Sequence, residues 1–127
     1  GYLYQDSAKD FLILHSLDGY DEVSLTGPVK FFYNAGERVI EPKDLSMKTL
    51  TRADIRGGNT VEESAAIFMR VLEGKGTEQQ NSAVIANAAM ALFAADQNAG
   101  LKAAVDKARE ALISGRALRH FKALLNN

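Results

Sequence analysis

Residues 11–22, FLILHSLDGYDE, decide how the chain begins to fold. The first five residues are a short apolar run bounded by polar residues, and this length and composition predict a buried β-strand over residues 11–15 rather than a helix. The residues after it are rich in turn formers and include three carboxylates, those of Asp18, Asp21 and Glu22. The stretch therefore predicts a strand that leads directly into an acidic loop.

A β-hairpin is predicted downstream of this loop. Val29, Phe31 and Tyr33 alternate with the residues between them, which is the period of two expected of a pleated strand. Residues 34–37, Asn-Ala-Gly-Glu, predict the turn, and residues 38–41 predict the returning strand.

The hairpin is predicted to end at Pro42, because proline interrupts strand pairing. Residues 43–58 are interpreted as an irregular connection, with the pair Gly57-Gly58 as its last hinge. Beyond this point the spacing of apolar residues changes to the 3.6-residue period of helices.

Two helices are predicted to begin at capping boxes. Thr60 with Glu63 starts a helix that ends near Gly74, and Thr77 with Gln80 starts another that ends before residues 98–100. The many alanines of the second helix predict close packing against a neighbouring helix. The predicted inner faces are Val61, Ala65, Phe68 and Leu72 for the first helix and Val84, Ile85, Ala88, Ala89, Leu92 and Phe93 for the second.

A last helix is predicted over residues 101–125, with Gly115 as a kink or interruption. The order of a few strands including a hairpin, then three helices, predicts an α/β fold. Residues 11–15 are apolar at successive positions, as in strands buried on both faces, yet so few strands cannot supply two covered faces. Either the sheet is very small, or its other strands lie outside this sequence. The predicted inner face of the last helix is Leu101, Val105, Ala108, Leu112, Leu118, Phe121 and Leu125.

The composition predicts one soluble domain. The chain has 127 residues, 46% of them hydrophobic and 24% charged, with a net charge of −1, so bulk charge does not steer it toward nucleic acid. It has no cysteine, which excludes a disulfide scaffold, a thiolate metal site and a cysteine nucleophile. No apolar run approaches the roughly 20 residues that cross a bilayer, so no membrane partner is expected.

The acidic loop is the first candidate for chemistry. Two carboxylates about 4 Å apart repel by about 1 kcal/mol in water and by more at lower dielectric, so a loop that gathers them often binds a cation. Mg²⁺ prefers one or two carboxylates together with waters and phosphate oxygens. Ligands of open parallel sheets also bind beyond the carboxyl ends of strands. The alternative is that these are solvated surface residues.

Other candidates are weaker. His15 ends the predicted strand and could touch a site or sit at the rim of the core, whereas His120 is expected at the surface. Residues 101–127 carry six Lys or Arg against two Asp or Glu, which is compatible with an RNA-binding face or with a solvated helix face. Residues 56–59, Arg-Gly-Gly-Asn, could bind an anion at a helix start or form a turn. Ser24 and Thr26 lack a histidine and an acid at recognisable spacing, so no nucleophilic catalysis is predicted.

Residues 17–28, LDGYDEVSLTGP, closely resemble the G-x-D-E-[IV]-S-L-x-G signature of the anthranilate phosphoribosyltransferases. Residues 54–58, DIRGG, followed by ESA at 63–65, resemble the R-G-G…E-N-A segment of that family, with Ser64 where the family usually has Asn. Residues 81–92 resemble its N-A-x-x-x-N-A-A-x-A-L helix, and residues 114–118 its S-G-[KR]-A-L tail.

The resemblance implies an enzyme that transfers a phosphoribosyl group from phosphoribosyl pyrophosphate to the amine of anthranilate in tryptophan biosynthesis. It implies a cytoplasmic homodimer with a small helical domain and a larger α/β domain of the nucleoside phosphorylase and phosphoribosyltransferase type, and no nucleic-acid partner. The adjacent Asp-Glu pair of the family helps to coordinate two Mg²⁺ ions on the substrate phosphates. The matching positions are Asp21 and Glu22, which we therefore predict as metal ligands.

The family's G-T-G-G-D loop, its K-H-G-N segment and its anthranilate-contacting residues do not occur in this sequence. We therefore interpret residues 1–127 as the C-terminal part of the α/β domain, without the helical domain, without catalytic residues of its own and inactive alone. Two alternatives remain open. The chain could be part of an enzyme like pyrimidine nucleoside phosphorylase, which has the same two-domain plan, or a binding module without catalysis.

Overall fold

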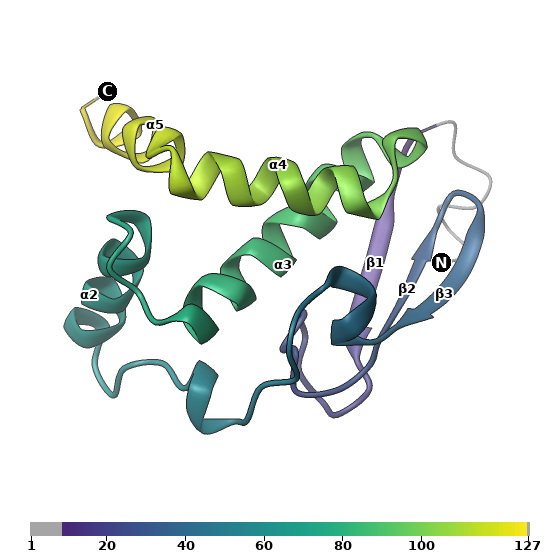
Figure 1. Cartoon of the computed structure of the whole chain (residues 1–127), viewed down its shortest axis with the longest axis horizontal. Coiled ribbons are helices and arrows are strands. Elements are labelled where there is room, and N and C mark those ends of the chain that lie inside the picture. Colours follow the sequence, from purple (N-terminus) through teal and green to yellow (C-terminus); the bar gives the residue numbers. More distant parts are fainter. Residues whose placement is uncertain (1–8, 127) are drawn as a thin grey trace.

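The computed structural model describes residues 9–126, in which three strands precede the helices (Figure 1). Strands β1 (Leu12–Ser16), β2 (Val29–Tyr33) and β3 (Gly36–Ile40) form an antiparallel sheet in the order β1-β2-β3. In its register Leu12 faces Tyr33 and Val29 faces Ile40. The predicted α/β class is confirmed, but within the described residues the sheet is antiparallel, so the rule for ligand sites of parallel sheets does not apply to it.

The alternation predicted for β2 is confirmed, because its odd positions face the core. Val29 and Phe31 are buried, and Phe31 has no exposed surface. The ring of Phe31 lies 5.3 Å from the ring of Tyr33 and 6.0 Å from that of Phe93, between centroids. These are favourable separations for tilted aromatic pairs, so this cluster ties the sheet to the helix that carries Phe93.

Strand β1 is buried on one face only within the described residues, which agrees with the expectation that so few strands cannot supply two covered faces. Leu12 and Leu14 are half-buried and pack against the core, whereas Ile13 is 37% exposed and His15 is exposed. The side chains of Ile13 and His15 stay exposed because no described element covers the outer face of β1.

The hairpin turn is shorter than the predicted residues 34–37, since Tyr33 pairs with Gly36 across a two-residue turn and the returning strand begins at Gly36. Gly36 has a φ of 133°, which its missing side chain permits at the start of β3. The connection after the hairpin contains two short 3₁₀ helices, η1 (Pro42–Leu45) and η2 (Ala53–Ile55). Pro42 ends the hairpin as predicted, and it does so by opening η1.

Four helices complete residues 9–126, where three were predicted. Gly115 has a φ of 80° and breaks the last helix in two, which confirms the predicted interruption. Among these described residues, no helix is both long enough and apolar enough to cross a membrane. The helices are α2 (Val61–Leu72), α3 (Glu78–Ala95), α4 (Leu101–Ile113) and α5 (Arg116–Leu125), with a 3₁₀ turn η3 (Gln97–Ala99) between α3 and α4.

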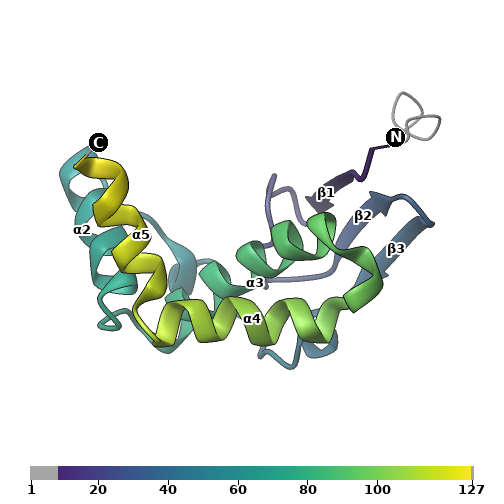
Figure 2. The same cartoon turned by 90° about the horizontal axis from the view of Figure 1, so that it is seen from above.

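Helices α3 and α4 pack side by side, as Figures 1 and 2 both show, and α3 also contacts β1 of the sheet. Ala86 and Ala89 on α3 are fully buried, and Ala104 and Ala108 on α4 are nearly so. Side chains this small allow the two helix backbones to approach closely. The prediction of close packing through alanines is therefore confirmed, and the predicted inner face of α4 is buried from Leu101 to Leu112. The predicted inner face of α3 is wrong at Val84 and Ala88, which are exposed.

Helix α2 is far less buried than predicted. Val61 is 81% exposed and Phe68 is 48% exposed, and only Val71 and Leu72 at its end are buried. Phe68 packs edge-to-face against Phe121 of α5, with 5.1 Å between ring centroids. The predicted inner face of α2 is therefore wrong at its first half, because α2 lies at the edge of the molecule and is packed mainly at its far end (Figure 1).

The two predicted capping boxes have different outcomes. At α3 the box is complete, since Gln80 N–H donates to Thr77 Oγ1 and Thr77 N–H donates to Gln80 Oε1, each at 3.0 Å. At α2 the Thr60 hydroxyl caps the helix as predicted, but the Glu63 carboxylate accepts from the N–H of Asn59, one residue earlier than a capping box requires.

Candidate functional site

The acidic loop connects β1 to β2 and is closed at its base. The N–H of Leu17 donates to the carbonyl of Pro28 at 2.9 Å, which continues the pairing of the two strands. The N–H of Ser16 donates to the carbonyl of Tyr20 at 2.9 Å, and Gly19, with a φ of 101°, allows this tight turn. The loop therefore has a defined course from its first residue.

The backbone of the loop is fixed again just after the acidic pair. The hydroxyl of Ser16 donates to the carbonyl of Glu22 at 2.5 Å. The N–H of Val23 donates to Asn87 Oδ1 at 2.9 Å, and Asn87 Nδ2 donates to the carbonyl of Val23 at 2.8 Å. Because Ser16 and Val23 are buried, these hydrogen bonds are shielded from water.

The side chains of the acidic pair remain free on this fixed backbone. Asp21 and Glu22 are exposed, and neither forms an ion pair within residues 9–126. Of the nearby cations, Arg52 lies over the ring of Tyr20 and Arg56 donates to Asn59. The pair therefore presents carboxylate oxygens that no described basic side chain neutralises.

Asp18, the third carboxylate of the loop, has a different environment. It accepts hydrogen bonds from the hydroxyls of Thr26 and Ser24, so it braces the loop from inside. Among the described residues, no three acidic, histidine or cysteine side chains come together in a way that could hold a metal ion. The loop thus offers two carboxylates, which fits Mg²⁺ bound partly by water and phosphate oxygens and does not fit a cage made by protein alone.

The backbone of Leu25, which lies after the acidic pair in the loop, has a strained conformation. Its φ is 61°, in the left-handed region that disfavours residues with a side chain by roughly 1–2 kcal/mol. It is 1% exposed, and its carbonyl accepts from the N–H of Leu50 at 2.8 Å. Burial and this hydrogen bond keep the strain in place, and strained residues of this kind are frequent near functional sites.

A hollow of about 290 Å³ lies beside the acidic loop, between α2, α3 and the segment before α2. Glu22 borders it together with Asn87, Arg56 and the apolar side chains of Phe68 and Val84. The carboxylate of Glu22 therefore lies beside a mostly apolar surface. Asp21 does not line this hollow and stands exposed beside it.

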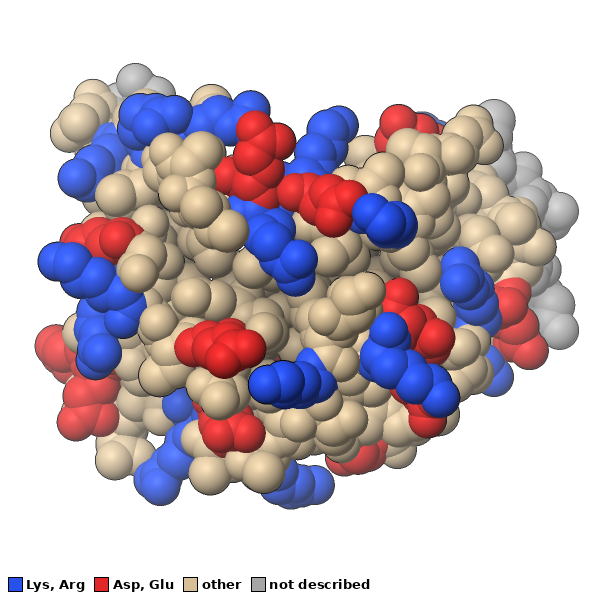
Figure 3. Space-filling model, in the orientation of Figure 1, with Lys and Arg blue, Asp and Glu red and all other residues tan. Residues whose placement is uncertain are grey.

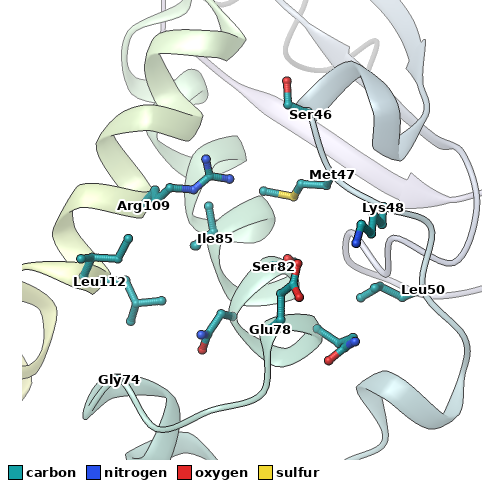
Figure 4. Close-up of a pocket in the computed structure, with 13 residues that line it drawn as sticks. Ser46, Met47, Lys48, Leu50, Gly74, Glu78, Ser82, Ile85, Arg109 and Leu112 are labelled. Atoms are coloured by element: carbon teal, nitrogen blue, oxygen red, sulfur yellow. The ribbon is translucent and has the colours of Figure 1, made fainter.

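A second hollow, of about 660 Å³, is separate from the acidic loop. It lies between α3, α4 and the segment after η1, and Figure 4 shows Arg109 of α4 pointing across it toward Met47. Glu78 and Lys48 also line it, whereas Asp21 and Glu22 do not. The two hollows therefore have different chemistry, and only the smaller one belongs to the candidate site.

The weaker candidates do not join the site. His15 is exposed on the outer face of β1, and His120 is exposed on α5. Ser24 is 2% exposed, and its hydroxyl lies 2.8 Å from that of Thr26, so it supports the loop. At residues 56–59, a Cβ added to Gly58 would lie 2.6 Å from the backbone nitrogen of Ser64, so this glycine permits a close-packed turn against α2.

The basic C-terminal segment carries charges of both signs on its surface. Lys102 forms an ion pair with Asp106 at 3.0 Å, and Arg116 forms one with Glu110 at 3.6 Å. Figure 3 shows lysine and arginine side chains along the edge formed by α4 and α5, with acidic side chains next to them. This pattern favours a solvated helix face over a continuous basic surface for RNA.

Reasoning from the sequence did not identify the two side chains that fix the loop backbone, those of Ser16 and Asn87. Ser16 looks like an ordinary turn former at the end of a strand. Asn87 carries a recognisable signal, because a polar amide in the apolar stripe of a helix needs hydrogen-bond partners. Its partners lie 64 residues away in the chain, which only the fold reveals.

Comparison with known proteins places this arrangement in a family. Residues 3–118 match the family described as "Glycosyl transferase family, a/b domain". The anthranilate phosphoribosyltransferase of Flavobacterium johnsoniae is 46% identical over 123 residues, which cover 97% of this chain and 37% of that protein. The Bacteroides fragilis protein of the same name is 40% identical over 121 residues, 95% of this chain and 37% of that protein. The chain thus spans little more than a third of the length of these relatives.

Solved structures agree with this placement. The crystal structure of anthranilate phosphoribosyltransferase from Thermus thermophilus superposes with a TM-score of 0.80 at 30% identity, over 93% of this chain and 36% of that one. The Saccharomyces cerevisiae enzyme in complex with PRPP and Mg has a TM-score of 0.75 at 22% identity, over 87% of this chain and 31% of that one, which shows the shared fold alone. Since the family match extends over most of its length, the chain belongs to the glycosyl transferase a/b domain family.

Proposed function

We propose that the chain provides the C-terminal part of the α/β domain of an anthranilate phosphoribosyltransferase. In this reaction the amine nitrogen of anthranilate forms a bond to C1 of the ribose while the bond from C1 to the diphosphate oxygen breaks. The amine loses a proton, and the products are N-(5-phosphoribosyl)anthranilate and pyrophosphate. The observation that carries the proposal is the 46% identity to the Flavobacterium johnsoniae enzyme over nearly the whole chain.

The acidic loop supports a role for Asp21 and Glu22 as Mg²⁺ ligands in that enzyme. Both side chains are exposed and are free of ion pairs within the described residues, and the peptide group that follows them is fixed by Ser16 and Asn87. Mg²⁺ held there supplies positive charge to the leaving diphosphate, on which negative charge develops. The Saccharomyces cerevisiae structure with PRPP and Mg is compatible with this chemistry.

The part of this chain in the reaction is to bind and orient. Asp21 and Glu22 present oxygen ligands from a loop of fixed course, which lowers the entropy lost when a metal and phosphates are bound. Asp18 keeps the loop folded through Thr26 and Ser24 and is not proposed as a ligand.

The remaining parts of the proposal concern the larger protein. We propose that residues 1–127 act together with an upstream part of the α/β domain and with a helical domain, in a cytoplasmic homodimer. The free edge of β1, which within residues 9–126 pairs with β2 alone, supports this, because the unpaired backbone groups of an edge strand can pair with further strands of a sheet. By itself the chain is expected to have no activity.

A hybrid enzyme tests the proposal. In it, this chain replaces the matching 37% of the Flavobacterium johnsoniae anthranilate phosphoribosyltransferase. We expect the hybrid to consume anthranilate in the presence of phosphoribosyl pyrophosphate and Mg²⁺, which the loss of anthranilate fluorescence measures. The isolated chain, assayed beside it, is expected to be inactive.

A hybrid that melts cooperatively but leaves anthranilate unchanged contradicts the proposal. A second assay on the same protein measures phosphorolysis of pyrimidine nucleosides, which separates the alternative of a pyrimidine nucleoside phosphorylase. A folded hybrid inactive in both assays favours a binding module without catalysis.

A further inference from the structure

We infer that Asn87 of α3 is a positioning residue that sets the geometry of the Asp21-Glu22 pair for Mg²⁺. This inference rests on the proposed function. Asn87 lies 64 residues from the loop in the chain and does not touch the reacting atoms in the proposal, so its effect passes through the loop backbone. The nearest acidic residue, Glu22, is bonded directly to the residue that Asn87 holds.

The peptide group that joins Glu22 to Val23 is held at both ends by side chains. Its carbonyl oxygen accepts from the hydroxyl of Ser16 at 2.5 Å, and its N–H donates to Asn87 Oδ1 at 2.9 Å. Ser16 belongs to β1 and Asn87 to α3. A planar peptide group held from two separate elements cannot rotate freely. The direction in which the Glu22 side chain leaves the backbone is therefore fixed.

The amide of Asn87 is itself fixed in orientation. Its Nδ2 donates to the carbonyl of Val23 at 2.8 Å and to the carbonyl of Ala83, one helical turn earlier, at 2.9 Å. Reversing the amide would set its NH₂ group against the N–H of Val23 and its oxygen against two carbonyls. Only an amide of this length matches the pattern, because aspartate lacks the donor and alanine lacks both groups.

The helix beneath Asn87 is rigid enough to act as a support. Its start is capped by the complete box of Thr77 and Gln80, and its inner face is buried at Ala86 and Ala89. Asn81 on the same helix shows that such bonding is not automatic, since its buried Oδ1 has no hydrogen-bond partner in the part of the chain that the structure describes. Both the oxygen and the nitrogen of the Asn87 amide, by contrast, have partners, two of the three hydrogen bonds being to Val23 of the loop.

Loss of this support should weaken Mg²⁺ binding while the ligands stay in place. Two neighbouring carboxylates repel each other, so a loop released from its support separates them or turns them outward. Residues that orient metal ligands typically contribute 10- to 100-fold in metal affinity or activity. For Asn87→Ala we expect the Mg²⁺ concentration for half-maximal rate to rise by roughly 10-fold or more, with a smaller change in rate at saturating Mg²⁺.

The test uses the hybrid enzyme with three variants. Asn87→Ala removes all three hydrogen bonds, and Asn87→Asp keeps the shape but loses the donors. Gln97→Ala is the matched control, because Gln97 is also an amide that links distant segments, donating to the carbonyl of Phe11 at 3.0 Å and to Asn34 Oδ1 at 2.8 Å, at the opposite end of the sheet. Each variant is measured for its Mg²⁺ dependence and for deuterium exchange of the peptide covering residues 17–28.

Both Asn87 variants should need more Mg²⁺ and exchange faster in residues 17–28, and Gln97→Ala should do neither. If Asn87→Ala and Gln97→Ala shift the Mg²⁺ dependence equally, or if exchange in the loop does not change, the inference is overturned. An unsubstituted hybrid that folds without activity contradicts the proposed function instead. In that case the exchange measurement alone decides whether Asn87 fixes the loop.

Discussion

The two ends of the molecule are packed to very different degrees. Around the sheet, α3 and α4, the core contains Phe31, Ala86 and Ala89 without any exposed surface. At the other end, α2 and α5 meet through a pair of half-exposed rings, those of Phe68 and Phe121, and Val61 remains 81% exposed. Figure 2 shows these two helices together at the edge away from the sheet.

This difference indicates where the chain is built to be rigid. The acidic loop lies on the well-packed end, with its backbone fixed by β1 and α3, and the metal site proposed there would gain from such support. The end with α2 and α5 leaves apolar side chains in water, so its packing contributes less to the stability of the chain.

The largest difference between the two ends should follow from removing one phenylalanine ring from each. Phe31→Ala leaves a cavity under the sheet and should lower the free energy of unfolding of the chain by about 3–5 kcal/mol. Phe68→Ala removes a ring that is already 48% exposed and should lower it by about 1 kcal/mol. Urea denaturation measures both, and equal losses would mean that the two ends are equally packed.

A smaller effect is expected where the connection meets α2. Gly58→Ala places a methyl group 2.6 Å from the backbone nitrogen of Ser64, and should lower the free energy of unfolding by roughly 1–3 kcal/mol. Gly57→Ala is the control, since its nearest neighbour is Ser64 Oγ at 4.0 Å. Thermal denaturation compares the two variants. If Gly58→Ala were as stable as Gly57→Ala, the start of α2 would have moved to make room for the methyl group. The end of the molecule with α2 and α5 would then be less tightly packed than its geometry indicates.

The smallest expected effect concerns the helix caps. Thr77→Ala breaks the complete capping box of α3 and should lower the free energy of unfolding by about 1 kcal/mol. Thr60→Ala removes the cap of the more exposed α2, and should chiefly speed amide exchange in the first turn of that helix with less effect on global unfolding. Denaturation together with hydrogen exchange distinguishes these outcomes. If Thr60→Ala lowered the free energy of unfolding more than Thr77→Ala does, α2 would contribute more to global stability than α3, which contradicts this prediction.

Much of the fold could be predicted from local patterns. The alternation at Val29, Phe31 and Tyr33, the cap at Thr77 and the break at Gly115 each depend on neighbouring residues, and each is confirmed. The open face of β1 could also be expected, because so few strands cannot cover both faces. The exposure of Val61 could not be predicted, because periodicity shows which residues share a face and not whether another element covers that face.

The candidate site, like the fold, could be predicted from the sequence only in part. The acidic residues could be found from the sequence because they are consecutive and resemble a family signature. The separate environment of Asp18 and the role inferred for Asn87 depend on contacts that only folding creates, with Thr26 and Val23 respectively. Spacing along the chain groups three carboxylates, whereas in the described residues the hydroxyls of Ser24 and Thr26 engage Asp18 and leave Asp21 and Glu22 exposed.

The most direct test of the central claim is the Mg²⁺ dependence of the hybrid enzyme carrying Asp21→Asn and Glu22→Gln together. The control carries Asp106→Asn and Glu110→Gln, which remove the same charge from the exposed surface of α4. We predict that the first double variant loses about 100-fold or more of its rate at limiting Mg²⁺, because several kcal/mol of charge stabilisation depend on the metal. The control should keep its rate. Equal rates in both double variants at limiting Mg²⁺ would contradict the assignment of this loop as the metal site.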